Sequence, residues 1–194
     1  MNIGVDIDGV LTDFERYVID YGIKISVEKN WPIKIDVSQY LDINVFDWDN
    51  NQAEIFRDKY FVKYLTETPV RLFAPEIIKK LKEEGNRIYL ITARDDDEMP
   101  EEHYGEIQSR TKEWLKKHNI IYDELIFKKE KLQPCIENNI DVMIEDSPEN
   151  IEKLSKQIKV IKFDCRYNND IENKRIITAY SWYHIYKIIK EMKQ

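Results

Sequence analysis

The fold is decided by the first stretch of the chain, Asn2-Ile3-Gly4-Val5-Asp6-Ile7-Asp8-Gly9-Val10-Leu11-Thr12-Asp13. Its apolar residues from Ile3 to Ile7 predict a buried strand that ends at two aspartates, Asp6 and Asp8. Open α/β sheets bind ligands at the carboxyl ends of their strands. Gly9 allows a turn there and a close approach of a ligand to the backbone. Two carboxylates beside free backbone N–H groups suit a magnesium ion and a phosphoryl group.

An Asp-x-Asp pair alone is also consistent with capping or turn chemistry. A second polar strand end supports the ligand interpretation: Thr92 closes the apolar run from Ile88 to Ile91. Its hydroxyl and the N–H of Ala93 can hold a phosphoryl oxygen, although a β-branched residue often simply finishes a strand. Arg94 follows, and it either reaches the phosphate or leaving group of a substrate or covers the surface.

A third strand end carries two adjacent acids, Glu145 and Asp146, after the apolar run from Val142 to Ile144. Ser147 and Pro148 then start a helix, as an N-cap and a first-turn proline do. Burying two carboxylates is costly unless a cation compensates, and magnesium is a suitable hard cation. The alternative, in which one acid caps the helix, leaves the other acid unexplained.

Length and composition indicate a globular chain. Its 194 residues favour one domain, with room for an inserted subdomain, and 42% of them are hydrophobic. No apolar run approaches the roughly 20 residues that span a membrane. The net charge of −7 argues against an extended nucleic-acid partner but allows a small phosphorylated substrate.

The expected location is the cytoplasm. Two charged residues, Asp6 and Asp8, interrupt the first apolar stretch, so no signal peptide is expected. The two cysteines, Cys135 and Cys165, are then expected to be free thiols in a reducing compartment. They form no Cys-x-x-Cys pair, so a zinc site is not expected.

Short apolar strands alternate with amphipathic helices along most of the chain, which predicts a parallel sheet of the Rossmann type. A segment near residues 175–182 is expected to complete the sheet edge and pack the last helix. The strand candidates are Ile3 to Ile7, Arg87 to Thr92, Glu124 to Phe127, Asp141 to Ile144 and Lys159 to Phe163; the helix candidates between and after them are Pro75 to Glu84, Glu106 to His118, Leu132 to Asn138, Pro148 to Gln157 and Ser181 to Met192.

Residues 14–73 do not follow this alternation, and we call them the cap segment. Helical spacing is visible from Phe14 to Tyr21 and from Gln52 to Leu65, so we expect a mainly helical insertion after the first strand. Residues 1–13 and 74–194 would form the core domain. The cap segment is rich in aromatic residues, which either form its own core or, in individual cases, stack on a substrate: Trp31, Tyr40, Phe46, Trp48, Phe56, Tyr60, Phe61 and Tyr64.

The motifs together resemble those of the haloacid dehalogenase (HAD) superfamily, most of whose members are phosphatases. The opening stretch is similar to motif I, Thr92 to motif II, and Glu145-Asp146 to motif IV. The forms Gly9-Val10-Leu11-Thr12-Asp13-Phe14, Ile91-Thr92-Ala93-Arg94 and Glu145-Asp146-Ser147-Pro148-Glu149-Asn150 look most like the 5'(3')-deoxyribonucleotidase branch and its bacterial relatives. The resemblance implies an α/β fold: a HAD-like Rossmannoid three-layer arrangement with a central parallel sheet and an inserted helical cap.

The resemblance also implies a ligand set and a lysine. Mg²⁺ would be held by Asp6, by Asp8 through its backbone carbonyl, and by Asp146, while Glu145 would support these groups or point elsewhere. The motif III lysine of the family lies at the start of the helix before the motif IV strand. Lys131 fits that place best, with Lys128 as the runner-up.

The mechanism implied by the resemblance starts with Asp6 as nucleophile and passes through an aspartyl-phosphate. Asp8 would act first as general acid and then as general base. Thr92, Ala93, Arg94 and Lys131 would bind the substrate, and Thr92 and Lys131 would also stabilise the reacting phosphoryl group. The expected activity is a magnesium-dependent phosphomonoester hydrolase, most like a 5'-nucleotidase on (deoxy)nucleoside monophosphates.

Two alternatives stay open at this point. One is a HAD phosphatase of another small metabolite, such as a sugar phosphate, because the cap segment sets the substrate. The other is a non-catalytic HAD-like binding module, which would be free to lose one of its five site residues, Asp6, Asp8, Thr92, Lys131 and Asp146. The acidic stretch from Asp95 to Glu102 is expected to be a solvated loop or to face the pocket. A homodimer is an option.

Overall fold

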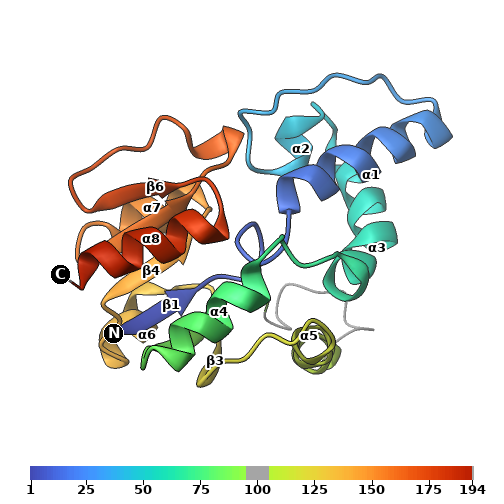
Figure 1. Ribbon diagram of the computed structural model, residues 1–194. Helices are drawn as coiled ribbons and strands as arrows, with labels where there is room; N and C mark the ends of the chain where they lie inside the picture. The colour runs from blue at the N-terminus through green and yellow to red at the C-terminus, as the bar shows by residue number, and fades with distance from the viewer. Residues whose placement is uncertain (95–104, 194) are drawn as a thin grey trace.

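The computed structural model describes residues 1–94 and 105–193. In it, the first strand, β1 (Asn2–Val5), lies in the middle of a six-stranded parallel sheet. The strand order is β3-β2-β1-β4-β5-β6 (Figure 1). The chain therefore builds one half of the sheet outward from β1 and then returns to start the other half at β4. Ligands bind at such a switch point in open α/β sheets. The other strands are β2 (Arg87–Thr92), β3 (Glu124–Phe127), β4 (Val142–Glu145), β5 (Lys159–Phe163) and β6 (Ile176–Ala179).

The expected strands match the structure closely, with differences at the ends of the first and fourth strands. The second, third and fifth strand candidates have the predicted limits, and the fourth is shifted by one residue. The first strand was expected to reach Ile7 but ends at Val5. The backbone N–H of Asp6 still bonds to Ile144, after which the chain turns back and the carbonyl of Ile7 accepts from Leu11 and Thr12. The turn therefore places Asp6 at the very end of the strand.

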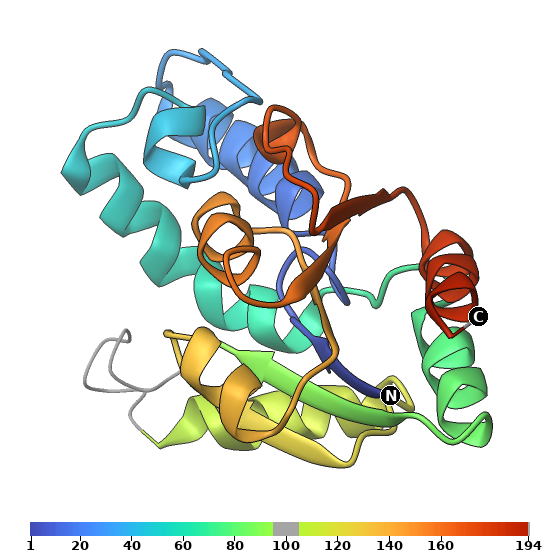
Figure 2. The same cartoon turned by 90° about the vertical axis from the view of Figure 1, so that its left-hand side faces the viewer.

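Helices cover both faces of the sheet and give three layers (Figure 2). On one face, α4 (Ala74–Glu83), α5 (Glu106–Lys117) and α8 (Trp182–Met192) pack on residues such as Ile3 and Val5. On the other, α6 (Leu132–Glu137) and α7 (Pro148–Leu154) pack on residues such as Tyr89 and Met143. Strands buried on both faces explain the nearly continuous apolar runs in the sequence.

The cap segment holds α1 (Phe14–Lys29), α2 (Asp42–Val45) and α3 (Asn50–Glu67). Both expected helices are present and extend further than predicted. Helix α1 starts at Asp13, whose side chain accepts from the Arg16 N–H, and α3 starts with a capping box formed by Asp49 and Gln52. The helices enclose an apolar cluster that includes Phe46, Trp48, Phe56 and Tyr60. Many of the cap aromatics thus form its own core.

The chain enters and leaves the cap segment at the same place. An isolated antiparallel bridge pairs Thr12 with Val70, so the entering and leaving chains run side by side. The division into residues 1–13 with 74–194 and residues 14–73 stays a prediction. Both cysteines are free and buried. Among the described residues, no helix combines the length and apolar character needed to cross a bilayer.

Candidate active site

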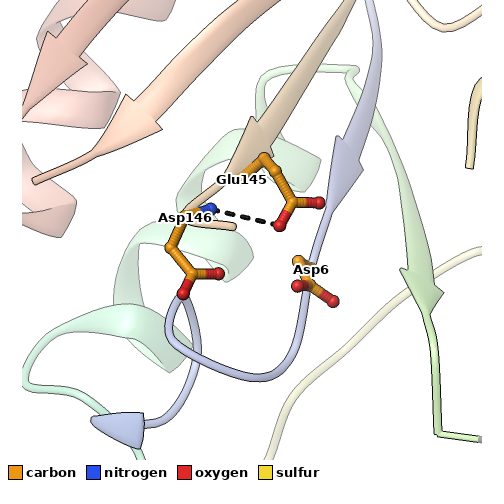
Figure 3. Close-up of side chains that lie close together, drawn as sticks. All are labelled: Asp6, Glu145 and Asp146. Carbon is orange, nitrogen blue, oxygen red and sulfur yellow. Dashed lines mark hydrogen bonds between the residues drawn. The ribbon is translucent and has the colours of Figure 1, made fainter. Parts of the chain in front are cut away.

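Three buried acids gather where β1 and β4 end. Oxygen atoms of Asp6, Glu145 and Asp146 all lie within 4.8 Å of one another (Figure 3). Neighbouring strands bring them together, because Val5 of β1 pairs with Ile144 of β4 and the acids follow directly. Residues about 140 positions apart in sequence thus share one corner of the sheet. Such a set of carboxylate oxygens can hold a hard divalent cation.

Lys131 supplies the positive charge on one side of this cluster. It lies at the N-cap position of α6, and its Nζ is 2.8 Å from both Asp6 Oδ2 and Glu145 Oε2. Burial would lower the pKa of Lys131, but the two carboxylates raise it, so the side chain stays charged. Lys128, the other candidate in the sequence, is exposed.

Glu145 is fully occupied by hydrogen bonds. Oε2 accepts from Lys131, and Oε1 accepts from the backbone N–H groups of Asp146 (3.2 Å) and Ser147 (3.1 Å). The sequence left the role of Glu145 undecided. Its contacts indicate that it fixes Lys131 and the turn that carries Asp146.

Asp146 has one bound and one unpaired carboxylate oxygen. Oδ2 accepts from the hydroxyl of Tyr167, whereas the buried Oδ1 finds no hydrogen-bond partner in the described part of the chain. Burial and the nearby charge of Glu145 raise the pKa of Asp146 to about 8, and the same two causes raise the pKa of Asp6 well above its usual value. A bound cation would relieve both effects. The donor set therefore fits Mg²⁺.

The charge balance of the site supports the same conclusion. Four carboxylates, Asp6, Asp8, Glu145 and Asp146, are paired with only two cations among the described residues, Lys131 and Arg94. The excess of two negative charges equals the charge of one divalent ion.

Asp8 is paired with Arg94. The guanidinium holds it as a fork, with Nη2 2.6 Å from Oδ1 and Nε 3.0 Å from Oδ2. Burial would raise the pKa of Asp8, but the charge and hydrogen bonds of Arg94 outweigh it and lower the pKa. Arg94 is buried, so the surface role left open by the sequence does not apply. Its Nη1 is buried without a partner among residues 1–94 and 105–193.

Thr92 lies at the same edge of the sheet as the acids. It ends β2, which neighbours β1, and its buried hydroxyl oxygen accepts from the backbone N–H of Arg94 at 3.3 Å. Ala93 is half-buried. The structure thus brings Thr92, Ala93 and Arg94 to the strand edge that carries Asp6 and Asp8. The acidic stretch 95–102, which follows directly, lies outside the described residues.

Aromatic side chains of the cap segment cover the site. The Tyr64 hydroxyl is 2.6 Å from Thr12 Oγ1, and the Arg94 guanidinium lies over the Tyr64 ring at 5.6 Å. The Phe14 ring lies 5.5 Å from the Tyr64 ring and 5.9 Å from the Tyr40 ring. Burial and the nearby carboxylates raise the pKa of Tyr40 well above its usual value. The phenol of Tyr40 therefore lies close to the acid cluster.

Two residues of the site were not found from the sequence. Tyr167 follows β5 in a stretch without a recognisable motif, and its hydroxyl donates to Asp146. Arg71 follows the cap segment helices, and its Nε donates to the carbonyls of Gly9 (3.1 Å) and Thr12 (3.0 Å). Neither residue belongs to a local motif, so no pattern in the sequence marks it.

Comparison with known proteins agrees with this geometry. The family model described as "5' nucleotidase, deoxy (Pyrimidine), cytosolic type C protein" matches residues 1–194. A protein of Clostridium acetobutylicum named as a nucleotidase is 31% identical over 195 residues, which cover 99% of this chain and 95% of that protein. A Chlorobaculum tepidum protein named "Putative 5'(3')-deoxyribonucleotidase" is 29% identical over 199 residues, 97% of this chain and 89% of that one.

Solved structures show the same fold. A haloacid dehalogenase-like hydrolase from Streptococcus pneumoniae superimposes with a TM-score of 0.65 and 14% sequence identity, and the match covers 97% of each chain. At this identity the likeness concerns the fold alone.

Proposed function

This chain belongs to the 5' nucleotidase, deoxy (Pyrimidine), cytosolic type C family and is a HAD-type phosphatase, and we propose that it is a magnesium-dependent 5'-nucleotidase that acts on (deoxy)nucleoside monophosphates through a phosphorylated Asp6. One observation carries the proposal. Asp6 lies 2.8 Å from the Lys131 ammonium and shares a buried cluster with Asp146, whose Oδ1 is unpaired among the described residues. The proposed nucleophile, a charged lysine and a carboxylate oxygen that is free to bind a metal therefore lie next to one another.

Asp6, Asp146 and the backbone carbonyl of Asp8 would hold Mg²⁺. When bound, the ion neutralises the charge of the carboxylates and of the phosphoryl group, which otherwise repel each other. Lys131 does part of this without the ion, because it contacts both Asp6 and Glu145.

The first half of the proposed reaction forms a bond between an Asp6 oxygen and phosphorus and breaks the bond to the leaving oxygen. Lys131, the Thr92 hydroxyl and the Ala93 N–H stabilise the phosphoryl oxygens. Asp8 gives a proton to the leaving oxygen. In the second half, Asp8 takes a proton from the attacking water, phosphate leaves, and Asp6 is restored.

Arg94 is well placed to bind the substrate phosphate. In this structure its fork is occupied by Asp8, with a spare Nη1 that has no partner in the described chain. Two phosphate oxygens can accept from the same pair of guanidinium N–H donors that a carboxylate uses, so phosphate competes with Asp8 for them. A substrate would therefore draw Arg94 toward its phosphate and release Asp8 to face the leaving oxygen.

The cap segment supports a nucleoside as leaving group. The Phe14 ring contacts the rings of both Tyr40 and Tyr64, and aromatic faces stack well on nucleobases. A sugar phosphate has no flat apolar ring to use such a surface. We therefore favour a nucleoside monophosphate over a sugar phosphate.

The test measures phosphate release by the purified chain with Mg²⁺ from deoxyribonucleoside, ribonucleoside and sugar monophosphates. We expect selective hydrolysis of nucleoside monophosphates that a chelator and Asp6→Asn both abolish. The matched control is Asp20→Asn, because Asp20 is an exposed aspartate on α1. Activity confined to sugar phosphates would overturn the substrate. Full activity of Asp6→Asn would overturn the nucleophile.

Two other expectations stay predictions. Light scattering of the purified chain would test whether it forms a homodimer. Fractionation of cells that express it would test the cytoplasmic location.

A further inference from the structure

A short 3-10 turn, η3 (Arg166–Asn168), follows β5 and lies between the acid cluster and the cap segment. In Figures 1 and 2 this orange turn lies beside the blue helix and loop of the cap segment. Its three side chains contact both the acid cluster and the cap segment.

The turn holds Asp146 at two atoms. The Tyr167 hydroxyl donates to Asp146 Oδ2, and Asn168 Nδ2 donates to the Asp146 carbonyl at 2.7 Å. Both residues are buried. Because one carboxylate oxygen is fixed, the direction of the other, Oδ1, is fixed as well. One carboxylate oxygen of Asp146 points toward Asp6, as Figure 3 shows.

Residues of the core hold the turn through hydrogen bonds. Lys162, a buried residue of β5, donates from Nζ to the carbonyls of Asn168 (2.9 Å) and Ile171 (3.1 Å). Asn168 also donates to the carbonyl of Phe163 at 3.0 Å. Within the described part of the chain, the hydrogen bonds of this buried ammonium go to backbone carbonyls, and they hold the loop against β5.

The cap segment contacts the turn through a ring pair and an ion pair. The Tyr40 ring lies 5.1 Å from the Tyr167 ring in an edge-to-face arrangement, and Arg166 Nε lies 2.7 Å from Glu15 Oε1. Tyr40 and Glu15 both belong to the cap segment. A continuous set of contacts therefore runs from Tyr40 through Tyr167 to the carboxylate of Asp146.

We propose that η3 couples the cap segment to metal binding: Tyr167 is a positioning residue that aims Asp146 Oδ1 at the cation, and Tyr40 holds Tyr167 in place. The proposal rests on the magnesium site proposed above. Residues that orient metal ligands through hydrogen bonds typically change metal affinity 10–100-fold when they are replaced. The same factor is expected for Tyr167, and a smaller one for Tyr40, which acts one contact further away.

The experiment titrates the purified, metal-free chain with Mg²⁺ in a calorimeter, without substrate. Tyr167→Phe keeps the ring and removes the hydroxyl, and we expect Mg²⁺ to bind 10–100-fold more weakly. Tyr40→Leu removes the ring contact, whereas Tyr40→Phe keeps it and should bind Mg²⁺ like the parent. Tyr180→Phe is the matched control, because Tyr180 is exposed and its ring stacks on His184 of α8. Phosphate release by Tyr167→Phe should recover as the Mg²⁺ concentration rises.

The outcomes separate the two proposals. If the parent itself binds no Mg²⁺, the metal site and this inference both fail. If the parent binds and a folded Tyr167→Phe binds equally well, only this inference fails. If Tyr167→Phe weakens binding but Tyr40→Leu does not, the coupling to the cap segment is wrong. Circular dichroism checks the fold, and Tyr40→Leu keeps the test decisive if Tyr167→Phe does not fold.

Discussion

Arg94 holds Asp8 with both arms of its guanidinium, 2.6 Å from Oδ1 and 3.0 Å from Oδ2. The two residues follow neighbouring strands, β2 and β1, and Arg94 is buried beneath the rings of Tyr64 and Trp114. The proposed acid–base group of the enzyme is therefore fixed by a partner that could itself bind phosphate. Several expected effects of substitutions depend on such pairings.

Arg94→Lys should lower kcat/KM by about 10–100-fold, because a lysine keeps the charge but loses the fork, and a charged hydrogen bond contributes about 1.5–3 kcal/mol. Steady-state kinetics on the preferred nucleoside monophosphate measure the effect. Arg87→Lys, an exposed arginine at the start of β2, is the control and should behave like the parent. An Arg94→Lys enzyme with parental kcat/KM would exclude a role for the fork.

Lys131→Met should destabilise the chain by about 3–5 kcal/mol and abolish turnover, because it leaves two buried carboxylates without their cation. Urea unfolding measures the loss, which should be smaller in Mg²⁺. Lys128→Met replaces the exposed runner-up and should leave both stability and activity unchanged. If Lys128→Met were the inactive variant, the assignment of the site lysine would be wrong.

Asp8→Asn should keep Mg²⁺ binding, because the proposed ligand at this position is the backbone carbonyl. It should lose more activity on an alkyl phosphate than on an aryl phosphate, since a phenolate leaves without needing a proton. The ratio of the two kcat/KM values gives the answer. An equal loss on both substrates would remove Asp8 from the acid step.

Gly9→Ala should inactivate the enzyme. A Cβ at Gly9 would lie 1.9 Å from Asp146 Oδ2, and φ at this position is +78°. Gly85→Ala is a matched control with nearly the same backbone, φ +80°, but with no atom within 4 Å of the added carbon. Its free energy of unfolding should fall only by the cost of a left-handed backbone at alanine, about 1–2 kcal/mol. Phosphate release and urea unfolding of both variants separate collision from strain, and an active Gly9→Ala would contradict the close packing.

His118 should make stability depend on pH. Burial and the charge of Lys117 lower its pKa below 6.5, and its buried Nε2 has no partner in the described chain. Between the folded pKa and 6.5 the unfolded state binds more protons, so stability falls as pH drops through this range. His118→Gln should reduce the difference between urea midpoints at pH 7.5 and pH 5.5. An unchanged difference would assign the dependence to other groups.

Much of the fold could be predicted from local patterns. The limits of β2, β3 and β5, the proline-led starts of α4 and α7, and the helical character of residues 14–73 all follow from apolar spacing and capping residues. The end of β1 was misjudged, because Ile7 continues the apolar pattern although the chain has already turned. Periodicity reports which residues are buried, and a buried turn gives the same signal as a buried strand.

The sequence by itself determined which side chains stand at strand ends: Asp6, Asp8, Thr92 and the pair Glu145-Asp146. Only the tertiary structure decided which groups meet. The strand order places β1 beside β4, selects Lys131 over its exposed neighbours, pairs Arg94 with Asp8 and sets Tyr167 on Asp146. The physical reason is that local spacing shows where an apolar run gives way to polar residues, whereas a side chain's partner depends on how elements far apart in the chain pack together.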